Sequence, residues 1–215
     1  MWDDAAVGLH SDSRSALDLA VAQGMIGGDL TAHISHANGF AAAFAVVEPT
    51  GEPRKVVDLG SGGGLPAFVL IEAWPSARFL LVEGRSKRAE LLDRGSRLMG
   101  VTDRVKVHTG DAQEAMIDPE WHGQADVATA RSFASPPIAA ECAAHFLKTG
   151  GWAIISEPPD DGLRADRWPS SLLEPLGLVA QPIATAHHRY IGLHKTGQTA
   201  VAPRKRKPME KSPLA

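Results

Sequence analysis

The strongest constraint on the fold is a glycine-rich segment, which reads Val56-Val57-Asp58-Leu59-Gly60-Ser61-Gly62-Gly63-Gly64-Leu65-Pro66. A β-branched run ends in an acidic residue, and the glycines that follow open what reads as a helix. Because glycine has no Cβ, the main chain there can approach a ligand closely and can adopt positive φ. A strand, a tight glycine turn and a helix N-terminus together form a nucleotide-type cradle at the carboxyl edge of a parallel sheet. The alternative is an ordinary glycine turn between a strand and a helix.

The spacing of the glycines favours one class of nucleotide. A dinucleotide-binding fingerprint, G-x-G-x-x-G, would need glycine at position 65, where this chain has Leu65. The observed pattern is G-x-G-x-G, formed by Gly60, Gly62 and Gly64, and Asp58 precedes it by two residues. This arrangement resembles motif I of the class I S-adenosylmethionine (SAM) methyltransferases, which implies that Asp58 and the three glycines contact SAM.

The rest of the chain predicts an α/β fold. Beyond Arg54, strand-like and helix-like segments alternate, which favours a mostly parallel, Rossmann-like sheet of seven strands with helices on both faces. Five strands are expected at 55–59, 78–83, 105–108, 125–130 and 152–156, and a closing antiparallel hairpin at 176–185 and 188–194. Helices are expected at 66–74, 87–99, 113–116 and 136–147. We divide the chain into a helical N-terminal extension (1–50), a ligand-binding domain (51–195) and a basic, flexible tail (196–215).

Composition and charge narrow the class of protein. The 215 residues are 44% hydrophobic and 22% charged, which is typical of a soluble globular chain. No run of about 18 apolar residues occurs and the N-terminus lacks the features of a signal peptide, so we expect a cytoplasmic protein without a membrane partner. Cys142 is the only cysteine, which excludes an internal disulfide and a multi-cysteine metal site. We expect no metal cofactor and a monomer.

The charge is unevenly distributed along the chain. From Lys195 onward there are six basic residues and one acidic residue, so the rest of the chain carries a net charge of −8. An acidic body with a basic tail predicts that the tail meets a polyanion. A solvated, disordered terminus is an equally good interpretation of the charge alone.

Two further groups are expected beside the glycine loop. Glu83 ends the second strand about twenty residues past the glycines, where a carboxylate can accept both ribose hydroxyls of a nucleotide, although a lone acid at a strand end is common. Asp111-Ala112-Gln113 follows the third strand, where methyltransferases place groups near the adenine edge. Asp111 is also a good helix N-cap, and the two roles are compatible.

A second segment narrows the resemblance. The run Ala130-Arg131-Ser132-Phe133-Ala134-Ser135, taken with the glycine loop, resembles the bacterial glucose-inhibited-division B family, whose members methylate guanine N7 in small-subunit (16S) ribosomal RNA. The tail at 204–214 resembles the C-terminal signature of that family. The resemblance covers about residues 55–156 and the tail.

The resemblance implies roles for individual residues. It implies SAM contacts at Gly60, Leu65, Ala112, Gln113 and Arg131. Arg131 is the candidate catalytic residue: its guanidinium could steer the guanine, bind an RNA phosphate or hold the methionine carboxylate, and a structural ion pair is the alternative. Phe133 is either a stacking surface for the base or a core aromatic. The tail residues expected to contact RNA phosphates are Arg204, Lys205, Arg206, Lys207 and Lys211.

Two departures from the family pattern favour a second hypothesis. The family's N-terminal W-N…N-L-T segment has no clear equivalent here, and only His33 and His36 are similar to its later histidine region. Family members also tend to carry a lysine after the fifth strand, where this chain has Glu157. The alternative is therefore a SAM-dependent methyltransferase of a small molecule that diverged from this family.

Overall fold

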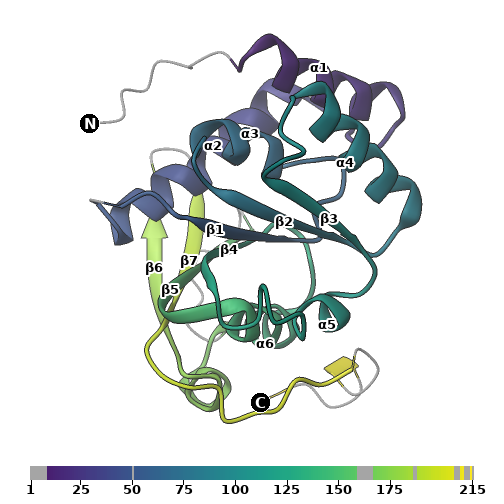
Figure 1. Ribbon diagram of the computed structural model, residues 1–215. Coiled ribbons are helices and arrows are strands. Elements are labelled where there is room, and N and C mark those ends of the chain that lie inside the picture. Colours follow the sequence, from purple (N-terminus) through teal and green to yellow (C-terminus); the bar gives the residue numbers. More distant parts are fainter. Residues whose placement is uncertain are drawn as a thin grey trace.

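The computed structural model describes residues 9–49, 51–158, 167–185, 188–205, 209–210 and 214. Within them a seven-stranded sheet has the order β3-β2-β1-β4-β5-β7-β6 (Figure 1). The strands are β1 (Lys55–Leu59), β2 (Arg78–Glu83), β3 (Val105–Thr109), β4 (Ala125–Ala130), β5 (Leu147–Ser156), β6 (Leu178–Ala184) and β7 (Arg189–Lys195). β1 to β5 pair in parallel, and β7 runs antiparallel to both of its neighbours. The direction of winding changes between β1 and β4, which is where ligands bind in sheets of this kind.

Helices cover both faces of the sheet, as the alternating pattern predicts. One face carries α1 (Ser11–Ala22), α2 (Leu30–Val47), α3 (Ala67–Ala73) and α4 (Ser86–Leu98). The other carries α5 (Ala112–Ala115), α6 (Pro136–Phe146), α7 (Ser170–Leu173) and a 3-10 turn (Glu174–Leu176). Figure 1 shows α1 to α4 above the sheet and α5 and α6 below it.

Two separate cores hold these layers together. Along β1, Val57 and Leu59 face the α6 side, whereas Val56 faces the α3 side. This alternation arises because successive side chains of a strand point to opposite faces. A strand buried on both faces is therefore apolar almost throughout, and Asp58 is the polar exception among the buried residues of β1.

The first fifty residues form a layer of the domain. Leu17 of α1 and Phe40 of α2 are fully buried in the core shared with the sheet. The Tyr190 hydroxyl on β7 donates a hydrogen bond to the His36 carbonyl oxygen (2.7 Å). A Cβ at Gly39 would lie 2.1 Å from the Tyr190 oxygen, so only glycine allows this approach. Within the predicted extension 1–50, α2 thus packs on α3 and on the sheet, and α1 packs on α3 and α4.

The described part of the tail is also packed. Met209 is fully buried and Val201 packs against the core on the α6 side. Figure 1 shows the C-terminal segment, in yellow, running beneath α6. The basic composition of 196–215 predicts a flexible tail, but the described residues contribute apolar side chains to a core.

Candidate active site

The glycine loop after β1 is held on the end of β2. Gly60 and Ser61 donate their N–H groups to the Val82 carbonyl oxygen (2.9 and 3.0 Å). The Glu83 carboxylate accepts from the N–H of Gly62 through Oε2 (2.9 Å) and from the N–H of Arg85 through Oε1 (2.8 Å). Glu83 is therefore part of the frame that shapes the loop, and each of its oxygens keeps a lone pair for a further donor.

The glycines of the loop differ in what surrounds them. Gly62 has φ +56°, and a Cβ there would meet only the Gly60 oxygen at 3.7 Å and Arg88 Nη1 at 4.0 Å. Gly60 has φ +71°, and its Cα faces the ring of Phe133, which a Cβ would approach to 2.9 Å. The main chain at Gly62 is thus not covered by a side chain, whereas the main chain at Gly60 is covered by an aromatic ring.

Gly64 is also required by the packing of the loop. It has φ +98°, and a Cβ there would lie 2.4 Å from the ring of Phe68 in α3. A Cβ at Gly63 would lie 2.6 Å from Ile26. These two glycines allow the loop to pack closely on α3 and on the segment between α1 and α2.

Asp58 is buried with an unfilled hydrogen-bonding site. Only 1% of its surface is exposed. Thr129, its partner in register on β4, donates Oγ1–H to Asp58 Oδ1 (2.6 Å). Oδ2 is buried without a hydrogen-bond partner among the described residues. Burial raises the pKa of this carboxyl to about 6, although the bond from Thr129 and the charge of Arg131 act in the opposite direction.

Arg131 follows β4 and faces α2. It is half-buried, and its Nη2 lies 2.8 Å from Nδ1 of His33. Burial lowers the pKa of the guanidinium, while Tyr190 and Asp58 act to raise it. The next residue, Ser132, has φ +53°, a conformation that is uncommon outside glycine. This turn sends Arg131 toward α2 and Phe133 over Gly60.

The turn after β3 reaches the same edge of the sheet. Asp111 occupies the N-cap position of α5 without a side-chain cap bond, and its Oδ1 is 3.9 Å from where a Gly84 Cβ would be. Ala112 is buried. The Gln113 amide donates to Met209 Sδ (3.0 Å), so this side chain faces the tail. Leu65 is 8% exposed within the core on the α3 side.

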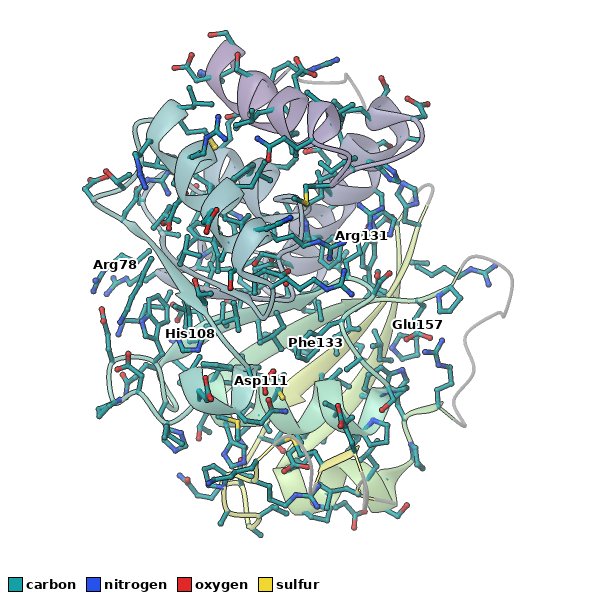
Figure 2. The ribbon with its side chains drawn as sticks, turned by 90° about the vertical axis from the view of Figure 1, so that its right-hand side faces the viewer. Arg78, His108, Asp111, Arg131, Phe133 and Glu157 are labelled. Carbon is teal, nitrogen blue, oxygen red and sulfur yellow. The ribbon has the colours of Figure 1, made fainter. Side chains whose placement is uncertain are left out.

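Figure 2 shows how these groups lie. Arg131 and Phe133 are near the centre of the view, with Asp111 and Glu157 to either side. The four residues come from the turns after β4, β3 and β5. The structure therefore brings the predicted groups of three turns to one edge of the sheet, beside the glycine loop and Glu83.

Glu157 and Arg204 are held in ion pairs. Glu157 accepts from Trp168 Nε1 (3.0 Å) and pairs with Arg167 (3.2 Å), so its charge is compensated. Arg204, which the sequence suggests for RNA, forms a two-pronged pair with the buried carboxylate of Glu141 on α6. Lys205 is exposed. The other predicted RNA contacts, Arg206, Lys207 and Lys211, lie outside the described residues.

Two cavities lie at the opposite edge of the sheet. One of about 310 Å³ lies before β1, where Pro53 and Arg54 are among its lining residues. The other, of about 350 Å³, is lined by residues that include His145, Lys195 and Thr199. Neither cavity includes a residue of the glycine loop.

Two other kinds of feature are absent from the described ranges. No three His, Cys, Asp or Glu side chains there gather as metal ligands do, and no helix there is both long and apolar enough to cross a bilayer.

Sequence reasoning missed two partners in this site. Thr129 is the register partner of Asp58, and a polar residue two positions before Arg131 on a buried strand was the available signal. His33 is linked to Arg131 across 98 positions of sequence. The one signal for His33 in the sequence was the similarity of its surroundings to a histidine region of the family that the chain resembles.

Relatives match the central part of the chain. A relative from Synechococcus sp. (strain WH7803), named ribosomal RNA small subunit methyltransferase G, is 37% identical over 103 residues, which cover 48% of this chain and 41% of the relative. One of the same name from Prochlorococcus marinus (strain MIT 9313) is 36% identical over 104 residues, covering 48% and 42%. The matched region thus spans about two fifths of the length of these relatives.

Solved structures share the fold at low sequence identity. An O-methyltransferase from Bacillus cereus, crystallised with SAH, aligns with a TM-score of 0.66 at 16% identity, over 89% of this chain and 94% of that one. The O-methyltransferase TomG from Streptomyces achromogenes, in complex with SAM, aligns with a TM-score of 0.62 at 16% identity, over 90% and 93%. These likenesses show the Rossmann-like fold of class I methyltransferases.

A family model also matches the central part of the chain. The model described as rRNA small subunit methyltransferase G covers residues 36–157, more than half of the chain. That range contains the glycine loop, Glu83, Asp111 and Arg131. The chain belongs to the rRNA small subunit methyltransferase G (GidB) family.

Proposed function

We propose that this protein is a SAM-dependent methyltransferase that acts on guanine N7 of small-subunit ribosomal RNA. The observation that carries the proposal is the glycine loop, which lies within the range of the family match. Its Gly62 main chain is bare and braced by Glu83, and its Gly60 lies against Phe133, two residues after Arg131. The relatives that are named as ribosomal RNA methyltransferases give the substrate class.

The residues at this edge fit SAM. Asp58 Oδ2 is a buried acceptor without a partner among the described residues, and a ligand carrying an ammonium group would satisfy it. Glu83 keeps acceptor capacity for ribose hydroxyls, and Gly62 allows close approach of the main chain. Asp111, Ala112 and Leu65 are proposed to line the adenine end, with Gln113 contributing through its main chain.

Methylation at N7 makes modest chemical demands on the protein. The cofactor would supply an electrophilic methyl group, and guanine N7 already carries an in-plane lone pair. No proton has to be removed before attack, so the protein mainly aligns the two partners. We propose that Arg131 orients the acceptor, since its guanidinium offers several donors in one plane.

RNA contacts outside the site are proposed for the tail. Lys205 is exposed and is suited to a phosphate, together with Arg206, Lys207 and Lys211. Arg204 is the weakest of the five candidates because its guanidinium pairs with Glu141. The proposed partner is ribosomal RNA or the small ribosomal subunit, which would place the protein in the bacterial cytoplasm. We propose separately that the protein is a monomer.

The small-molecule alternative rests on Glu157 and on the altered N-terminus. Arg167 compensates the charge of Glu157, so that residue adds little negative charge to the site. Helix α2 packs against the sheet and brings His33 to Arg131. No contact in the described structure favours a small-molecule acceptor over RNA.

The cofactor site is tested with two matched glycine variants. Gly62→Ala and Gly100→Ala both place alanine at positive φ (+56° and +64°), and neither methyl would be crowded by the protein. Each variant should therefore lose a similar amount of stability, about 1–2 kcal/mol. Calorimetry should show that Gly62→Ala binds SAM about 10- to 100-fold more weakly, because its methyl fills ligand space, whereas Gly100→Ala binds normally.

The acceptor is tested on RNA. Small ribosomal subunits from a strain lacking the gene, incubated with protein and SAM, should gain 7-methylguanosine in nucleoside mass spectrometry. SAM binding without methylation of naked RNA or of subunits would count against the RNA acceptor and not against the cofactor site. Equal SAM affinity of both glycine variants would remove the basis of the cofactor assignment.

A further inference from the structure

The N-terminal helix α2 reaches the candidate active site through one histidine. His33 lies in the first turns of α2, and its Nδ1 is 2.8 Å from Arg131 Nη2. Its other ring nitrogen, Nε2, is 2.8 Å from the carbonyl oxygen of Gly27. Both ring nitrogens are thus engaged, one by the site and one by the loop that precedes the helix.

The chemistry of the partners fixes the protonation of this ring. A guanidinium has only N–H donors, so His33 Nδ1 must accept a hydrogen bond and carries no proton. A carbonyl oxygen only accepts, so Nε2 must carry the proton and donate it to Gly27. One arrangement satisfies both bonds: a neutral imidazole in the Nε2–H tautomer.

A second histidine of α2, His36, also feels the charge of Arg131. His36 lies one turn further along α2, and burial, followed by the charge of Arg131, lowers its pKa to about 4. A neutral His36 adds no positive charge beside the guanidinium. His36 is held by other contacts, with its ring 4.7 Å from that of His188 and 5.6 Å from that of Tyr190.

We infer that His33 is a positioning residue, which holds the Arg131 guanidinium in the orientation that methyl transfer requires. The inference rests on the proposed function. Arginine has a long side chain that loses much rotamer freedom when it is fixed, and a hydrogen bond to a neutral acceptor fixes it without cancelling its charge. A carboxylate in place of His33 would hold the guanidinium but neutralise it toward the substrate.

A purely structural role for His33 is the competing explanation. The docking of α2 has other contacts, since Phe40 is fully buried and the Tyr190 hydroxyl bonds to the His36 carbonyl. Removing His33 should therefore leave α2 in place, and its effects on stability and on the reaction should separate.

Three substitutions divide the two bonds of the ring. His33→Asn can keep an acceptor near the Nδ1 position, whereas His33→Gln can keep a donor near the Nε2 position. His33→Ala keeps neither. We expect methyl transfer to fall by up to about 100-fold in His33→Ala, to be partly restored in His33→Asn, and to stay low in His33→Gln. All three should melt close to the wild-type temperature.

A double-mutant cycle ties the effect to Arg131. Arg131→Ala should show the larger loss, in SAM affinity or in turnover according to what the guanidinium binds. Adding His33→Ala to Arg131→Ala should lower the same parameter no further, because a positioning residue has nothing left to position. Losses that multiply, or a His33→Ala variant with wild-type turnover and SAM affinity, would overturn the inference.

The ring itself gives a readout that needs no activity. The ¹⁵N spectrum of the His33 side chain should show a protonated Nε2 and an unprotonated Nδ1, and the Nδ1 signal should move in Arg131→Ala. If wild-type protein methylates no RNA, the proposed function fails, whereas this spectrum still reports the contact between His33 and Arg131. A protonated Nδ1 at neutral pH would overturn the contact itself.

Discussion

Two buried carboxylates, Asp58 and Glu141, differ in how completely the fold satisfies them. Each exposes 1% of its surface. Asp58 points away from the α6 side of the sheet, which its neighbours Val57 and Leu59 face, whereas Glu141 belongs to α6 itself. Both oxygens of Glu141 accept from the guanidinium of Arg204. Asp58 accepts from Thr129 through one oxygen only, and burial raises its pKa to about 6.

The difference separates a carboxylate whose partner the fold itself supplies from one that keeps an unsatisfied oxygen, which we propose as an acceptor for SAM. A buried polar atom without a partner destabilises the folded state by about 1–3 kcal/mol, so native structures contain few of them. The unsatisfied oxygen of Asp58 lies in β1, which leads into the glycine loop. The neighbouring strand, β4, leads into Arg131 and the strained Ser132. Around Glu141 the chain supplies its own cation from 63 residues away.

The largest expected effect concerns the completed pair. Arg204→Met leaves Glu141 buried without its cation, which should lower the free energy of unfolding by about 3 kcal/mol. Urea denaturation monitored by tryptophan fluorescence measures the change. The double variant Arg204→Met with Glu141→Leu should recover most of the loss, since it removes the stranded charge. An unchanged urea midpoint for Arg204→Met alone would contradict the pairing.

The next effect concerns the incomplete site. Asp58→Asn keeps an acceptor for Thr129 and removes a desolvated carboxylate, so stability at pH 7 should be equal or higher. SAM affinity should fall by about 10- to 100-fold, the worth of a hydrogen bond between charged groups. Calorimetry and urea denaturation on the same samples test both halves. Lower stability together with unchanged SAM affinity would make Asp58 a structural residue like Glu141.

The pH dependence of stability gives a separate test of Asp58. Its pKa is about 6 in the folded state against an ordinary 3.8, so the folded form binds more protons between these values. The free energy of unfolding contributed by Asp58 should therefore fall as pH rises from about 4 to about 6, by an amount on the order of 3 kcal/mol. Burial lowers the pKa of His36 to about 4, which acts with the opposite sign in the same range. The difference between wild type and Asp58→Asn isolates the carboxyl.

The elements that the sequence predicts well are those fixed by local pattern. β1, β2 and β4 begin and end at the predicted residues, because buried apolar runs bounded by turn residues have few alternatives in an α/β chain. β5 begins at Leu147 instead of Trp152, since its first residues pair with β4 across a register irregularity at Ala125. Local pattern does not reveal such irregularities.

The features that sequence reasoning could not supply depend on contacts distant in sequence. Arg204 reads as one of a run of phosphate-binding cations until Glu141 is seen beneath it. Glu157 reads as added negative charge until Arg167 is seen beside it. Gly64 fits the glycine motif, but it is also needed to clear the ring of Phe68. In each case the residue itself is visible in the sequence, but the group that it contacts depends on the tertiary structure.

The smallest effect is expected at Ser132, the strained residue of the incomplete site. Its φ of +53° is costly for a side chain with a Cβ, and Ser132→Gly relieves about 1 kcal/mol of strain. Glycine also gains freedom in the unfolded chain, which offsets roughly the same amount, so the free energy of unfolding should change by less than about 0.5 kcal/mol.

The rate of methyl transfer should nevertheless fall, by less than about tenfold, because a freer turn directs Arg131 and Phe133 less well. Ser132→Ala is the matched control: it loses the hydroxyl but keeps the restricted backbone, so its rate should stay near wild type. A Ser132→Gly variant that is more stable by over 1 kcal/mol and methylates at an unchanged rate would show that the backbone strain at Ser132 does not contribute to the reaction. The contrast between Asp58 and Glu141 would then depend only on how each carboxylate is hydrogen-bonded.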